Sequence, residues 1–164
     1  MAYALESMLR IRTMREDRAA TELTAARREV VRAQEALAQR RNDLAEYEVA
    51  KEARRDSIFS AVMGRAVSMA DLDRAREGVA RIDEEGILKA DNVVQAEAEL
   101  QKRRDYAETS RRMFVSASKN RMKITEHRAI WELEELEAAE RRQESELEDF
   151  TGKKVIDDAE LSGS

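Results

Sequence analysis

The sequence contains neither cysteine nor proline among its 164 residues, and only five glycines. Without cysteine the chain can form no disulfide and no thiolate metal site, which fits a reducing compartment. Without proline, no residue inside a helix lacks the backbone donor that a helix needs. Aromatic residues make up 4% of the chain, too few for a thick globular core.

Long apolar runs are also missing. No stretch of about 18 consecutive apolar residues occurs, so the sequence predicts no transmembrane helix. The opening residues MAYALESMLRIRTMRED lack the uncharged apolar core of a signal peptide. We therefore expect a soluble, cytoplasmic protein without membrane insertion.

Charged residues of both signs make up 40% of the chain, and apolar residues recur between them in steps of three and four. This spacing is typical of a coiled coil. One predicted seam contains Leu5, Leu9, Ala19, Leu23, Ala26, Val30, Ala33, Leu37, Leu44, Tyr47 and Ile58. The second contains Leu72, Ala75, Val79, Ile82, Val93, Ala96, Leu100, Ala107, Phe114, Ala117 and Ile124. Past Trp131 the register shifts to Leu133, Leu136, Leu147 and Phe150.

A turn is predicted between the two seams. Gly64 suits the left-handed end of one helix, and Ser68 with Asp71 matches the capping box that begins another. So short a linker makes the helices antiparallel neighbours. Pairing outward from the turn then brings the N-terminus near residues 125–128.

The predicted fold is all-α: a long antiparallel two-helix coiled-coil hairpin with a longer second arm. We expect the first helix over about 3–63, the turn over about 64–68 and the second helix over about 69–150, as one hairpin domain over 1–150. Residues 151–164 are expected to form a flexible tail, because the helical pattern breaks at Thr151 and Gly152. Gly78 and Gly86 lie inside the second helix at a cost of about 1 kcal/mol each, so bending or fraying is expected there.

No catalytic constellation is present, so we expect no enzymatic activity, no cofactor and no metal. The single histidine, His127, follows Ile124 by three residues, whereas a helical di-iron site needs Glu-x-x-His. We expect His127 to be a solvated helix residue.

Two charged segments follow one another in the second helix. Residues 101–128 are basic, but nucleic-acid binding also favours aromatics for base stacking, and these are scarce. A solvated face and a docking surface for an acidic protein both fit this segment. Residues 131–149 are acidic and contain Trp131, which either packs over Leu5 and Leu9 or enters another protein.

The turn is richer in apolar residues than its closure requires, since Ile58 packing on Leu72 would suffice. The surplus residues are Phe59, Val62, Met63, Val67 and Met69. Methionine suits surfaces that adapt to a partner, and clustered exposed apolar groups mark interfaces. The alternative is that these side chains fold back along both helices.

The stretches LESMLRIRTMREDRAATEL and IFSAVMGRAVSMADLDRAR, together with two unequal helical arms, resemble the YscO/FliJ family of type III secretion proteins, nearer its YscO branch. The resemblance implies a stalk similar to the γ subunit of rotary ATP synthases. It would sit in the hexameric secretion ATPase, link it to the export-gate protein and handle substrate chaperones, at the cytoplasmic face of the apparatus.

On this resemblance we expect the ATPase to contact the end that holds both termini, through Leu5, Leu9, Arg12, Arg15, Trp131 and Leu133. The export gate is expected to contact Phe59, Val62, Met63, Val67 and Met69 at the turn. A monomer that binds no nucleic acid is expected. Two other classes compete with this interpretation: a structural coiled coil that acts by dimerising or scaffolding, and a helical regulator or nucleic-acid binder.

Overall fold

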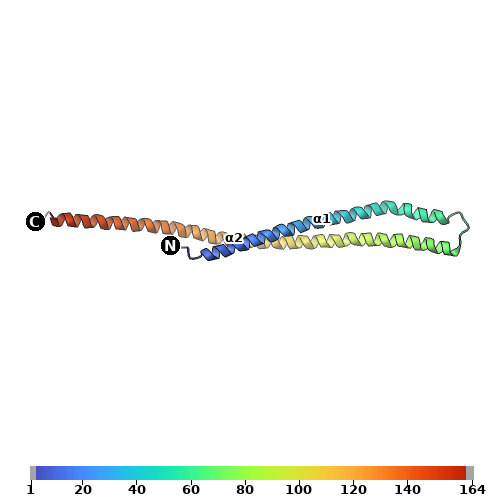
Figure 1. The fold of residues 1–164 in the computed structure, drawn as a ribbon, viewed down its shortest axis with the longest axis horizontal. Helices are drawn as coiled ribbons and strands as arrows, with labels where there is room; N and C mark the ends of the chain where they lie inside the picture. Colours follow the sequence, from blue (N-terminus) through green and yellow to red (C-terminus); the bar gives the residue numbers. More distant parts are fainter. Residues whose placement is uncertain (1–2, 162–164) are drawn as a thin grey trace. The chain divides into compact units, whose positions relative to one another are not determined.

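The chain folds into two long helices, described by a computed structural model. Helix α1 spans Glu6–Val62 and helix α2 spans Met69–Leu161. The structure describes the backbone of residues 3–161 and the side chains of residues 3–151, and the described backbone contains no strand. The predicted fold class, an all-α antiparallel helical hairpin with a longer second arm, is confirmed (Figure 1).

Within this hairpin the chain divides into two compact units. The turn unit is Ala19–Met113, and the terminal unit combines Met1–Arg18 with Phe114–Ser164. The expectation of one hairpin domain over residues 1–150 did not foresee this division. Side chains in a helix pair touch only near neighbours, so the periodicity of a seam does not show where one compact unit ends.

In the turn unit, α1 and α2 pack along the two predicted seams. The best-buried aliphatic side chains, between 2% and 7% exposed, are Leu23, Ala26, Leu37, Ile82 and Leu100. The half-buried seam positions are Ala19, Val30, Ala33, Leu44, Ile58, Leu72, Ala75, Val79, Val93, Ala96 and Ala107. Every predicted seam residue of this unit therefore lies at least partly inside the helix pair, as heptad spacing requires.

The turn between the helices is built as the sequence indicates. Gly64 has a φ of 74°, a left-handed conformation that residues with a Cβ rarely adopt. The Ser68 amide donates to Asp71 Oδ2 at 3.1 Å, and the Asp71 amide donates to Ser68 Oγ at 3.2 Å. This reciprocal pair is the predicted capping box. Donation from the Ser68 hydroxyl, and then from its amide, lowers the pKa of Asp71.

Helix α2 continues through Gly78 and Gly86, so the expected fraying there was wrong. The reason lies on α1. A Cβ at Gly78 would be 3.0 Å from Ile58 Cδ1, and one at Gly86 would be 3.1 Å from Tyr47 Cε1. Both glycines let a larger α1 side chain lie close against the α2 backbone, which offsets their low helix propensity.

Tyr47 makes several different contacts within the turn unit. Its side chain is 6% exposed, and its hydroxyl donates to the carbonyl oxygen of Ile82 on α2. The Arg54 guanidinium lies 5.6 Å from the ring centroid and Lys89 Nζ lies 5.7 Å from it, both within cation–π range. The ring is thereby held on several sides.

In the terminal unit, the start of α1 packs beside α2. The half-buried side chains of this seam are Leu5, Leu9, Phe114, Ala117 and Ile124. Past Trp131, α2 continues to Leu161, so the predicted helix end near 150 was wrong. One glycine costs only about 1 kcal/mol in a helix, and the Thr151 hydroxyl donates to the Leu147 carbonyl at 3.0 Å. Residues 162–164 lie outside the described residues.

Candidate partner-binding surfaces

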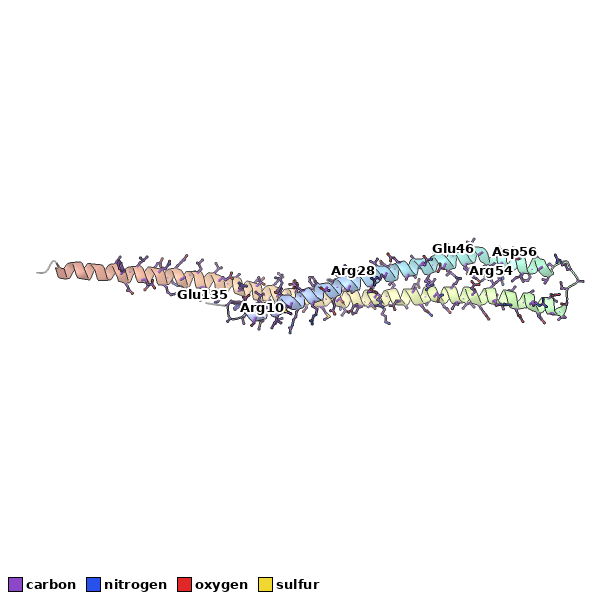
Figure 2. The ribbon with its side chains drawn as sticks, viewed as in Figure 1. Arg10, Arg28, Glu46, Arg54, Asp56 and Glu135 are labelled. Atoms are coloured by element: carbon purple, nitrogen blue, oxygen red, sulfur yellow. The ribbon has the colours of Figure 1, made fainter. Side chains whose placement is uncertain are left out.

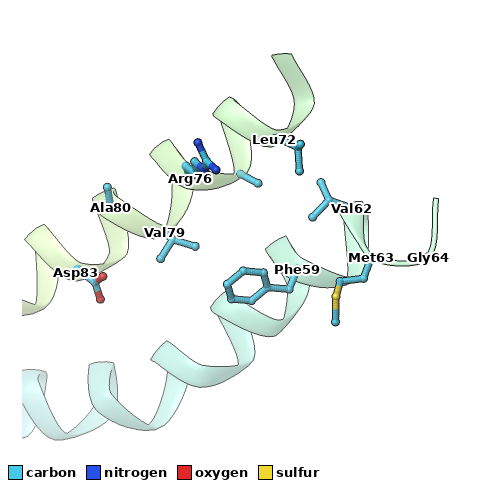
Figure 3. Close-up of a pocket in the computed structure, with 10 residues that line it drawn as sticks. Phe59, Val62, Met63, Gly64, Leu72, Arg76, Val79, Ala80 and Asp83 are labelled. Atoms are coloured by element: carbon cyan, nitrogen blue, oxygen red, sulfur yellow. The ribbon is translucent and has the colours of Figure 1, made fainter. Parts of the chain in front are cut away.

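An apolar groove lies beside the turn, wholly within the turn unit (Figure 3). Its volume is about 670 Å³. From α1 and the turn it is lined by Phe59, Val62, Met63 and Gly64, and from α2 by Leu72, Ala75, Arg76, Val79, Ala80 and Asp83.

The structure brings together part of the predicted turn cluster. Phe59, Val62 and Met63 line the groove, whereas Val67 and Met69 are not among its lining residues. Met63 is 72% exposed, Met69 71% and Phe59 46%. Met63 and Met69 thus keep more than two-thirds of their surface exposed, whereas Phe59 is about half covered and Val62 and Val67 are half-buried. An apolar groove with exposed methionines beside it is a surface that suits a partner.

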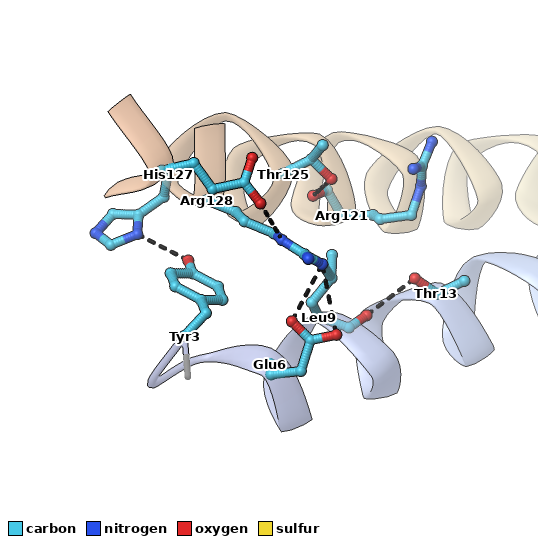
Figure 4. A network of polar contacts seen from close by, with 9 residues as sticks. Tyr3, Glu6, Leu9, Thr13, Arg121, Thr125, His127 and Arg128 are labelled. Carbon is cyan, nitrogen blue, oxygen red and sulfur yellow. Dashed lines mark hydrogen bonds and ion pairs between the residues drawn. The ribbon is translucent and has the colours of Figure 1, made fainter. Parts of the chain in front are cut away.

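A second cluster gathers where the N-terminus meets α2 in the terminal unit (Figure 4). The Tyr3 hydroxyl and His127 Nδ1 are 2.8 Å apart, and the ring centroids of Tyr3 and Trp131 are 5.3 Å apart. Tyr3 is only 8% exposed. The expected approach of the N-terminus to residues 125–128 is thereby observed.

This cluster corrects two expectations for single residues. Trp131 packs on the ring of Tyr3. It therefore makes a contact within the chain, with Tyr3 as its partner where Leu5 and Leu9 had been expected. His127 is exposed, yet it shares a hydrogen bond with Tyr3 instead of being merely solvated. The predicted position of the N-terminus was the signal that could have found this contact, since Tyr3 is the aromatic residue nearest to it.

Ion pairs surround the same end of the terminal unit. Glu16 on α1 pairs with Arg121 on α2, and Arg128 lies 3.1 Å from Glu6 and 2.9 Å from Glu132. The hydrogen bond that Arg128 donates to Glu132, and then the charge of Glu6, raise the pKa of Arg128. Glu16 thus reaches across to α2 and joins the start of α1 to it.

The predicted ATPase-binding residues divide into two groups. Leu5, Leu9, Arg12 and Trp131 are half-buried in the terminal unit, while Arg15 and Leu133 are exposed. Leu133 is 62% exposed and does not share the packed face of Trp131. The two groups therefore do not form one continuous packed cluster.

The basic segment 101–128 is largely engaged in pairs within α2. Arg103 lies 2.7 Å from Glu99, and Glu108 lies 2.9 Å from Arg111 and 3.2 Å from Arg112. Hydrogen bonds and charge from these two arginines lower the pKa of Glu108 to about 2. Such pairing is typical of a solvated helix face. Figure 2 shows further charged side chains, among them Arg28, Glu46 and Arg54, projecting from the helices.

The described residues carry neither a metal-binding cluster nor a membrane-spanning helix. Within the residues that the structure describes, no group of three or more histidine or acidic side chains could hold a metal ion. Neither described helix is long and apolar enough to cross a membrane.

The fold and its surfaces define a helical hairpin protein with exposed apolar patches. A family model described as type III secretion protein YscO matches residues 5–153. The chain therefore belongs to the YscO family of type III secretion proteins, and the predicted family is confirmed.

The crystal structure of the type III secretion protein YscO from Vibrio parahaemolyticus is similar to this chain, with a TM-score of 0.82. The two share 20% sequence identity over 89% of this chain and 92% of the other. At that identity the likeness concerns the fold. No curated protein matches the sequence.

Proposed function

We propose that this protein is a non-enzymatic stalk and adaptor that links the hexameric secretion ATPase to the export gate. Membership of the YscO family supports a role in type III secretion. The observation that carries the finer proposal is the apolar groove at the turn, beside which Met63 and Met69 are 72% and 71% exposed. An apolar surface of this kind gains free energy when a partner covers it.

The groove and its surroundings are the proposed contact for the export-gate protein. Phe59, Val62 and Met63 would supply the floor and edge of this contact, with Val67 and Met69 extending it. Methionine side chains adapt their shape to the partner at low cost. The charged rim formed by Arg76 and Asp83 would fix the orientation of the bound segment.

The proposed ATPase contact lies in the terminal unit. Arg12 and Arg15 would orient the ATPase through carboxylates, because the guanidinium group matches them in a bidentate arrangement. Leu5, Leu9, Trp131 and Leu133 would contribute apolar burial. The Tyr3–Trp131 contact holds the start of α1, with Leu5 and Leu9, beside Trp131 on α2, while Leu133 lies on an exposed face.

The remaining parts of the proposal follow from this role. The protein would work at the cytoplasmic face of the apparatus, bring substrate chaperones to it and need neither a cofactor nor catalysis. It would act as a monomer, because its seams are already occupied by its own two helices in the turn unit.

The proposal is tested by capturing the ATPase of the same gene cluster with the tagged protein and measuring the mass of the free protein by light scattering. The wild type should capture the ATPase and have a mass near 18.8 kDa. Replacing Arg12→Glu and Arg15→Glu together should abolish capture while the helical circular dichroism signal stays the same.

The matched control is the double variant Arg27→Glu and Arg28→Glu. It makes the same change in net charge, but at two exposed residues of the turn unit. This variant should still capture the ATPase. If both double variants captured the ATPase equally, the proposed ATPase contact through Arg12 and Arg15 would be wrong. If the free protein had twice the monomer mass, a dimerising coiled coil would be favoured instead.

A further inference from the structure

The part of α2 that follows Trp131 carries a second apolar stripe. Its large members are Leu133, Leu136, Leu147 and Phe150, which are between 58% and 69% exposed. Their spacing of three, eleven and three residues places them at the a and d positions of the first and third of three heptads, and Glu140 and Gln143 occupy these positions in the middle heptad. We call residues 132–151 the overhang.

This stripe does not continue the seam that α1 occupies. Successive helix residues are rotated by about 100°, so Leu133 lies about 200° around α2 from Trp131. Trp131 faces Tyr3 at the start of α1, and the stripe therefore faces a different side. Extending α1 would not cover it, so a covering partner must approach from elsewhere.

The positions that flank the stripe are acidic. With Leu133 at position a and Leu136 at position d of the heptad, positions e and g flank the stripe. Four of them are glutamates: Glu132, Glu137, Glu144 and Glu146. The other two are the uncharged Ala139 and Thr151. Glu132 pairs with Arg128 along the helix. Glu137, Glu144 and Glu146 have no ion pair with another described side chain. The two arginines of the segment, Arg141 and Arg142, occupy positions away from the stripe.

The charges around the stripe indicate which kind of partner could bind to it. Residues 129–150 contain nine acidic and two basic side chains, a net charge of −7, while the whole chain has a net charge of −5. Two copies pairing through this stripe would oppose glutamate to glutamate in either orientation, and like charges at these positions disfavour pairing. A second copy is therefore the wrong partner.

We propose that the overhang docks an amphipathic helix of another protein, with aliphatic residues on one stripe and lysine or arginine at the flanking positions. Leu136, Leu147 and Phe150 supply the apolar contact, and the flanking glutamates select the basic partner. Glu140 and Gln143, the polar residues of the middle heptad, fix the register, as polar residues at seam positions do in coiled coils. This surface is separate from the export-gate contact and shares only Leu133 with the proposed ATPase contact.

The test uses the full-length protein and two labelled synthetic peptides of about three heptads, followed by fluorescence anisotropy. Both peptides have leucine at the a and d positions. The basic peptide has lysine at all e and g positions, and the acidic peptide has glutamate there. The basic peptide should bind at least about tenfold more tightly than the acidic one, with an advantage that shrinks as salt is raised.

Two variants separate apolar from charged recognition. Leu136→Ser with Phe150→Ser should abolish binding of the basic peptide. The control Ile87→Ser with Val94→Ser should not, although these residues are equally exposed, at 63% and 62%. Glu137→Lys, Glu144→Lys and Glu146→Lys together should reverse the preference toward the acidic peptide.

The proposal would be overturned by binding of neither peptide, by equal binding of both, or by loss of binding in the Ile87 and Val94 control. Formation of a dimer that the Leu136 and Phe150 variant dissolves would also overturn it, since a second copy would then be the occupant. All these variants leave Leu133, Arg12 and Arg15 unchanged, so failure here does not imply failure of the ATPase contact.

Discussion

The turn unit and the overhang of α2 carry apolar residues with the same heptad spacing, but only one of them is packed. Leu37 in the turn unit is 6% exposed, whereas Leu136 in the overhang is 58% exposed. Spacing creates an apolar helix face in both places, and burial follows only where a second helix covers that face. A stripe without its own partner inside the chain is a place to look for one outside it.

The largest effect that separates the two regions is expected from truncating their leucines. Leu37→Ala removes a buried side chain and should lower the free energy of unfolding by about 2 to 3 kcal/mol. Leu136→Ala should change it by less than about 0.5 kcal/mol, as surface substitutions do. Urea unfolding followed by circular dichroism measures both. Equal losses would mean that the overhang is packed in solution.

A smaller effect distinguishes two glycines of the turn unit. Gly86→Ala should lower the free energy of unfolding by about 1 kcal/mol, because overpacking against Tyr47 exceeds the gain in helix propensity. Tyr47 is held by Ile82, Arg54 and Lys89, and so cannot move aside.

Gly78→Ala is the control for this substitution. Its Cβ would meet the flexible end of Ile58, which borders an open groove of about 680 Å³ and can shift. This variant should therefore be neutral or slightly stabilising in the same unfolding experiment. If Gly86→Ala proved the more stable of the two, Tyr47 would not be fixed in place.

The smallest expected effect comes from comparing two glutamates. Glu108 in the turn unit is paired with arginines, whereas Glu144 in the overhang has no ion pair with another described side chain. The arginines at 111 and 112 lower the pKa of Glu108 from 4.5 to about 2. Because the folded pKa is depressed, this carboxylate stabilises the fold above about pH 4.5, and the contribution is lost as the pH falls toward about 2.

Glu108→Gln should therefore lower the melting temperature near neutral pH, and its difference from the wild type should narrow as the solution is acidified. Glu144→Gln, in the overhang, should leave the melting temperature near neutral pH unchanged, because Glu144 has no ion pair with another described side chain. Melting curves recorded between about pH 6 and pH 2 would show both. A constant difference for Glu108→Gln would mean that its pairing with the arginines does not stabilise the fold.

Much of the fold could be predicted from sequence because it depends on local and periodic rules. Gly64, Ser68 and Asp71 determine the turn through backbone conformation and capping, which short spacings reveal. The seams follow from heptads. The helix through Thr151 and Gly152 was missed because one glycine was given more weight than its energetic cost justifies.

Other contacts could not be predicted because they join residues far apart in the chain. The Tyr3–His127 hydrogen bond spans 124 residues, and the Tyr47–Ile82 bond depends on a glycine on the opposite helix. The turn groove was only half anticipated. The sequence identified Phe59, Val62 and Met63, but the α2 side of the groove, including Val79 and Ala80, comes from the packing of the two helices.

The central claim is that exposed apolar side chains at the turn serve a partner and contribute little to the fold. The most direct test replaces Met63→Ser and Met69→Ser together and compares melting temperature with capture of the export-gate protein. Both side chains are more than two-thirds exposed, at 72% and 71%, so the melting temperature should stay within about 2 °C of the wild type while capture is lost. A sharply lowered melting temperature, or unchanged capture, would contradict the account.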